Sequence, residues 1–244
     1  MGVFVFPTGS SSGGEDLPWH TVDLSSGWSS PTDPDGIISS ASTTSGSGLT
    51  TFEYNAISSG STAYTMASNA ADLKVWRVSR ALQFGGANLT GSDSVLIALE
   101  IDCSSGFVDD GATQIGLMLS KDPTSTTRAT AAMCGIVEQH TGGAGAPDFV
   151  TISPTGAGTV LGNANNQIAR AFFAVHAGAV TPVESIVTGN GNVYGPSGRD
   201  AGITFGSGDT LNLALVAGTR GSSTINAGDM AAAKMRWAVT RLGS

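Results

Sequence analysis

Three segments of the chain alternate apolar and polar residues with a period of two, and this pattern constrains the fold more than any other feature. They are SVLIALEID at 94–102, DTLNLALV at 209–216 and KMRWAVTR at 234–241. Successive side chains of a β-strand point to opposite faces of a sheet, so the alternation gathers the apolar side chains of each segment on one face. Each segment is therefore predicted to be a strand with one buried face.

Weaker versions of the same pattern recur along the chain, giving about ten strands in all. The further candidates are residues 19–24, 49–55, 63–66, 74–82, 114–120, 131–139, 149–152 and 167–176. Gly, Ser, Asn, Asp and Pro separate them, and the chain contains 34 glycines, which favour turns. Helix is conceivable only at residues 66–73 and 229–234, for about two turns each.

This spacing predicts an all-β protein: an antiparallel β-sandwich, jelly-roll-like, with long Gly/Ser/Thr-rich loops and an extended N-terminal arm. No shift in composition divides the chain into two cores. We expect residues 1–14 to be the arm and residues 15–244 to form a single sandwich domain.

The arm begins with an apolar hook, Val3, Phe4, Val5 and Phe6, followed by a Ser/Gly spacer. Two readings of the hook stay open, a frayed tail and a strap that buries both phenylalanines against a neighbouring subunit. The arm has no basic n-region, and its apolar run is too short for a signal peptide or a membrane span. We therefore expect no membrane insertion.

The net charge of −8 comes from 11 basic and 19 acidic residues. Binding to nucleic acid requires clustered Lys and Arg to neutralise phosphates, so no nucleic-acid partner is expected. Anionic membrane surfaces are disfavoured for the same reason. An acidic surface fits solubility and self-repulsion, or docking onto a basic partner.

Glu100 and Asp102 are the best candidates for catalysis, because two carboxylates two residues apart share one face of a strand. Glycosidases use paired carboxylates. The favoured alternative is that both carboxylates form the solvated side of a half-buried strand, since no stripe of aromatic residues accompanies them. None of the serines lies in a nucleophile elbow. We expect no enzymatic activity.

Metal-ligand spacing is missing around His20, His140 and His176, and no cofactor or metal is expected. Cys103 and Cys134 are read as small buried side chains, with a disulfide between them left open. Two acidic turns, Asp33–Gly36 and Asp109–Gly111, could be fragments of calcium loops, although ordinary turns are favoured. Gly156–Gly158 and Gly189–Asn192 are predicted to be hairpin turns.

Several longer runs resemble the β-sandwich proteins carried on the virions of tailed bacteriophages. They are WHTVDLSSGWSSPTDPDG, RALQFGGANLTGSDSVLIALEID and GLMLSKDPTSTTRATAAMCGIVEQHTG. The resemblance is one of pattern over most of residues 19–241 and includes no catalytic motif.

The resemblance implies a structural protein of the virion surface, assembled in the host cytoplasm. The expected role is a capsid decoration (cement) or knob protein that self-associates, commonly as a homotrimer, and binds other virion proteins such as the major capsid protein. The alternative is a tail or fibre module that binds a receptor or carbohydrate. Trp28 and Tyr194 are the candidate platform for such a glycan, because exposed aromatic rings stack on sugars.

Overall fold

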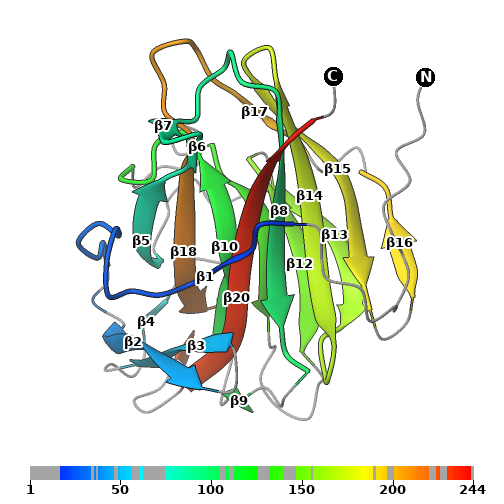
Figure 1. The fold of residues 1–244 in the computed structure, drawn as a ribbon. Coiled ribbons are helices and arrows are strands. Elements are labelled where there is room, and N and C mark those ends of the chain that lie inside the picture. The colour runs from blue at the N-terminus through cyan, green and yellow to red at the C-terminus, as the bar shows by residue number, and fades with distance from the viewer. Residues whose placement is uncertain are drawn as a thin grey trace.

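A computed structural model gives the fold of the chain (Figure 1). It describes residues 17–33, 36, 38–46, 49–56, 61–62, 75–104, 108–109, 113–125, 132–139, 147–154, 156–188, 191–196, 201–219, 224–225 and 230–242. Every strand pairing in these residues is antiparallel. Two sheets lie face to face, so the predicted all-β, jelly-roll-like sandwich is confirmed.

Sheet A has ten strands within the described residues. Its main path is β16 (Asn192–Tyr194), β15 (Ala179–Val187), β14 (Ile168–His176), β8 (Val95–Asp102), β20 (Met230–Arg241), β3 (Leu49–Ala56) and β2 (Ile38–Gly46). Three short strands join this path: β1 (His20–Thr21) and β9 (Val108–Asp109) on β20, and β17 (Ile203–Thr204) on β15.

Sheet B has six strands in the described part of the chain. In order they are β13 (Gly156–Asn163), β12 (Asp148–Ser153), β11 (Cys134–Gln139), β10 (Thr113–Ser120), β18 (Asn212–Thr219) and β5 (Trp76–Ala81). Two small ribbons complete the strands: β4 (Ser61–Thr62) with β19 (Thr224–Ile225), and β6 (Gln83–Phe84) with β7 (Ala87–Asn88).

The core between the sheets is built from the apolar faces that the alternation predicts. On β8 it takes Val95, Ile97, Leu99 and Ile101, all fully buried. Across from them lie Ile115, Leu117 and Leu119 of β10 and Leu213 and Leu215 of β18. Burying one such side chain contributes about 1.5–3 kcal/mol, so this layer is the main source of stability.

Strand β20 begins four residues earlier than the segment at 234–241 predicts, because the Ala-rich stretch before Lys234 is extended. Residues 230–234 pair with β3, which excludes the helix considered for 229–234. The other helix candidate, 66–73, lies outside the described residues. Within the residues that are described, no helix is long and apolar enough to cross a bilayer.

Parts of both outer faces of the sandwich are buried as well, which strict alternation does not predict. On sheet A, Leu96, Ala98, Phe172 and Ala238 form a second apolar cluster. On sheet B, a third cluster faces away from the core: Val75, Met118, Met133, Val137, Val150, Ile152, Ala214 and Val216. Polar side chains on these faces are therefore withdrawn from water and need partners inside the protein.

Candidate functional site

The carboxylates of Glu100 and Asp102 lie on the outer face of sheet A, opposite the core, as the alternation predicts. The side chains are nevertheless buried: Glu100 is 1% exposed and Asp102 is 7% exposed. The expectation that they form a solvated face is wrong. The reason is that another part of the chain covers this side of the sheet.

Glu100 is the centre of an ion-pair cluster with two arginines. The strand register places it opposite Arg170 of β14 and opposite Arg236 of β20. Arg170 Nε donates to Oε2 at 2.6 Å, while Arg236 donates from Nε to Oε1 and from Nη2 to Oε2 at 3.1 Å. Both carboxylate oxygens therefore accept charge-assisted hydrogen bonds, which tie the three central strands together across the sheet.

Asp102 is held differently, by its own turn. Its Oδ1 accepts hydrogen bonds from the backbone N–H of Ser104, at 2.8 Å, and from the Ser104 hydroxyl. This arrangement is an Asx turn at the end of β8, which closes the strand. The two carboxylates that the sequence pairs as a catalytic candidate thus have separate structural partners.

The N-terminal strap, defined here as residues 17–28, covers the Glu100 cluster. Figure 1 shows it crossing in front of β20 and β8. The Trp19 ring lies over the Arg236 guanidinium at 4.4 Å and over that of Arg170 at 5.6 Å. Leu17 packs on the apolar cluster beside it, and His20 and Thr21 pair with β20. The strap is thus fixed by stacking, apolar contact and backbone hydrogen bonds.

Trp28 closes the other end of the strap. Its ring meets Trp237 edge-on at 6.1 Å, and the Arg80 guanidinium lies 5.9 Å from its centroid. Its indole N–H donates to the Asp23 carbonyl at 2.8 Å. Gly27 adopts a φ of +80°, a conformation that favours glycine, and this lets the chain turn into the contact. Trp28 is half-buried, and these contacts hold the strap against the edge of the sandwich.

Tyr194 lies on β16, at the opposite edge of sheet A from the Trp28 contact. The structure therefore does not bring the two aromatic residues into one platform. Tyr194 is half-buried and lines a pocket between the edge strands of the two sheets. Asn192 donates a side-chain hydrogen bond to its hydroxyl at 3.1 Å.

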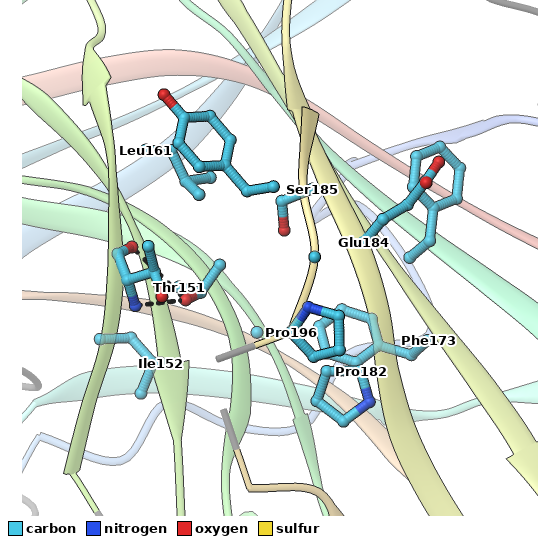
Figure 2. A pocket seen from close by; sticks show the side chains of 13 residues that line it. Thr151, Ile152, Leu161, Phe173, Pro182, Glu184, Ser185 and Pro196 are labelled. Carbon is cyan, nitrogen blue, oxygen red and sulfur yellow. Dashed lines mark hydrogen bonds between the residues drawn. The ribbon is translucent and has the colours of Figure 1, made fainter. Parts of the chain in front are cut away.

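The edge pocket, defined here by the space beside Tyr194, is small. Figure 2 shows Thr151 and Ile152 on one wall and Ser185, Pro182 and Pro196 on the other. Its enclosed volume of about 10 Å³ holds about one water molecule. The interior of the pocket is therefore too small for a sugar ring.

Glu184 borders the edge pocket from the far side of β15, where it lies opposite Phe172 in the register of the sheet. Burial next to apolar groups raises the pKa of this carboxyl above its ordinary value. Glu184 was not singled out from the sequence, because Pro182 interrupts the pattern expected of a strand and β15 was not predicted.

Three further predictions from the sequence concern other parts of the chain. The hook at Val3, Phe4, Val5 and Phe6 lies outside the described residues. Cys103 and Cys134 are buried, as predicted, and both are free thiols, which answers the question of a disulfide that the sequence leaves open. Asp33 makes an ordinary turn: Gly36 N–H donates to its carbonyl at 3.1 Å, and Ile38 N–H to its carboxylate at 2.9 Å.

Sequence reasoning missed the Trp19, Arg170 and Arg236 cluster. A signal for part of it exists, because the strands at 167–176 and 234–241 each carry an arginine on the face opposite their core residues. Their meeting at Glu100 depends on the sheet order, with β8 between β14 and β20. That order joins segments far apart in sequence, which alternation alone does not determine.

Comparison with known proteins gives similarity of fold only. No protein-family model matches the sequence, and no curated relative does either. Alginate lyase A1-II′ in complex with product has a TM-score of 0.43 at 14% identity, over 80% of each chain. The globular domain of T. cruzi calreticulin has a TM-score of 0.41 at 8% identity, and the match covers 90% of this chain and 82% of the calreticulin chain. The carbohydrate recognition domain of Emp47p has a TM-score of 0.37 at 10% identity, and the match covers 89% of this chain and 90% of the Emp47p domain.

These matches correct one expectation from the sequence. A protein without enzymatic activity was expected, and that expectation is contradicted because alginate lyases are among the matching structures.

Proposed function

We propose that this chain is a structural protein of a tailed-phage particle, a capsid decoration or knob protein that attaches through its N-terminal arm and self-associates. The observation that carries the proposal is the N-terminal strap. Trp19 is held over two arginines and Leu17 on an apolar cluster, so the arm that precedes them starts from a fixed point on sheet A.

An anchoring arm must be firmly attached to the folded domain, because a pull on the arm is then borne by the sheet and does not detach the strap. Strap and sheet are joined by the pairing of His20 and Thr21 with β20, a central strand. In the sequence, the hook supplies an apolar end, and the Ser/Gly spacer adds a reach of at most about 3.3 Å per residue. The net charge of −8 favours attraction to a basic shell.

The test is attachment to particles that lack the protein. Deleting residues 2–14 should abolish binding, measured by cosedimentation, while the thermal unfolding midpoint stays unchanged. A second variant, with Ser at positions 3–6, keeps the length of the arm and should lose binding equally. Unchanged occupancy with either variant would refute the role of the arm, and light scattering that gives a monomer would refute self-association.

A second candidate function is a receptor-binding or carbohydrate-binding module, and the specific observation for it is that Tyr194 lines the edge pocket. An aromatic ring beside amide and hydroxyl groups, here Asn192 and Ser185, matches the usual chemistry of sugar contact. Binding on a glycan array that Tyr194→Ala removes, and Trp28→Ala leaves, would support this function. An array without any bound glycan would exclude it.

A further inference from the structure

Arg77 occupies an unusual place on the outer face of sheet B. It lies in β5, between Trp76 and Val78, whose side chains enter the core between the sheets. Its own side chain therefore points to the other face of the sheet. It is only 1% exposed and stands first among the largest fully buried side chains.

The neighbours of Arg77 on that face are apolar. Across the strand pair it lies opposite Val216 of β18, and Val75 precedes it by two residues on the same face. Burial lowers the pKa of the guanidinium, while Asp122 acts in the opposite direction through its charge. The Asp122 carboxylate is engaged in its own turn, accepting from the N–H groups of Thr124 at 3.1 Å and Ser125 at 3.2 Å.

The Nε, Nη1 and Nη2 atoms of Arg77 are all buried, and no acceptor in the described part of the chain lies within hydrogen-bonding distance of them. The other described arginines differ. Arg170 and Arg236 bond Glu100, Arg80 stacks on two tryptophans, and Arg241 stacks on Phe84. Polar groups elsewhere on the same face are also paired, since Gln114 donates to Gln139 at 3.0 Å.

A buried guanidinium cannot avoid the cost of an unpaired charge by losing its proton, because it stays charged at every accessible pH. Leaving such a charge unpaired costs several kcal/mol, a large part of the stability of a typical domain. Its planar fork of N–H donors matches the two oxygens of a carboxylate. We infer that Arg77 anchors a binding site for a carboxylate group on the outer face of sheet B. This site is independent of the N-terminal arm and of the edge pocket.

Sodium formate is the probe, because it is the smallest carboxylate and can enter an enclosed site. Thermal unfolding of the full chain is measured from 1 to 100 mM formate, with sodium chloride added to hold the ionic strength constant. A ligand bound only by the folded state raises the midpoint, by about 5–11 °C at 100 times its dissociation constant for a chain of this size. The wild type should show this rise, and Arg77→Met should not.

Arg241→Met is the matched control, because it also removes one positive charge but leaves Arg77 in place, and it should respond to formate as the wild type does. Should Arg77→Met fail to fold, the Nε–H resonance of Arg77 in the wild type supplies a second readout and should shift with formate but not with chloride. A wild-type midpoint that is equal in formate and chloride would overturn the inference. So would an equal response of wild type and Arg77→Met.

Discussion

Glu100 is a buried carboxylate that binds two arginines. Replacing it tests how much this ion-pair cluster on the outer face of sheet A contributes to stability. Glu100→Gln removes the negative charge that Arg170 and Arg236, whose side chains are 26% and 17% exposed, both bind. Breaking a buried pair from one side costs about 3 kcal/mol. Urea unfolding should show this loss. Glu184→Gln is the control, and should not destabilise, because burial already disfavours the charged form of Glu184. An equal effect of the two variants would contradict this view of the cluster.

Cys103 gives a residue-scale prediction about pH. Burial, with the nearby charges of Glu138 and Asp102, raises the pKa of this thiol above its ordinary value. The folded protein therefore keeps the proton, while the unfolded chain releases it as pH rises past about 8.5. Stability from this group is present below that pH and declines above it. A thiol reagent should leave Cys103 unmodified in the native protein at pH 9 and modify it after denaturation. Rapid native labelling would contradict the prediction.

The hairpin between β14 and β15 offers a prediction at the scale of one element. His176 pairs with Ala179, so Ala177 and Gly178 form a two-residue turn with φ values of 49° and 77°. Such turns favour Asn-Gly, because Asn tolerates positive φ better than Ala. Ala177→Asn should therefore stabilise the protein by about 0.5–1 kcal/mol. Differential scanning calorimetry measures the change, and a lower midpoint would show that the turn is not of this type.

Gly178 provides the matching destabilising variant in the same hairpin. An added Cβ would lie 2.8 Å from the carbonyl oxygen of Phe205, in addition to the strain of a positive φ. Gly191 also has a positive φ, of 66°, but open space around it. Gly191→Ala should cost about 1 kcal/mol, and Gly178→Ala clearly more, in chemical denaturation. An equal loss of stability in the two variants would mean that the backbone at Phe205 moves away from the added Cβ without strain.

The strands that alternation predicts are those whose side chains all follow the pattern, such as β8, β10 and β18. Strands β13 and β15 were missed for physical reasons. The glycines of Gly156–Gly158 led to the prediction of a turn there. In the structure Gly156 already belongs to β13, because it pairs with Ser153 of β12. β15 contains Pro182, which removes a backbone donor, and the sheet accommodates it at the register shift beside Phe173. Val187 of β15 pairs with Asn192 of β16, while residues 189 and 190 of the hairpin turn predicted at Gly189–Asn192 lie outside the described residues.

The candidate site was less predictable than the strands, because it depends on contacts between distant segments. Tyr194 could be named as an aromatic residue in a polar loop, but its place beside Ser185 required the β15–β16 pairing. Glu100 could be named as a carboxylate, but its burial required the N-terminal strap. Local pattern gives the face on which a side chain lies, while the covering of that face is decided by the order of strands in the sheet.

The last strand in sequence is central in the whole molecule. β20 lies between β8 and β3 and also pairs with β1 and β9. A chain cut before Met230 would leave the apolar face of β8 with one open edge and the strap without its partner strand. We expect this truncation to remain unfolded by near-ultraviolet circular dichroism, whereas deletion of residues 2–14 should change stability by less than about 0.5 kcal/mol. Because the native pairing joins residues more than a hundred positions apart, folding should take milliseconds to seconds. A cooperatively folded truncation would show that sheet A forms without β20, and the central place of this strand would then be unnecessary for the fold.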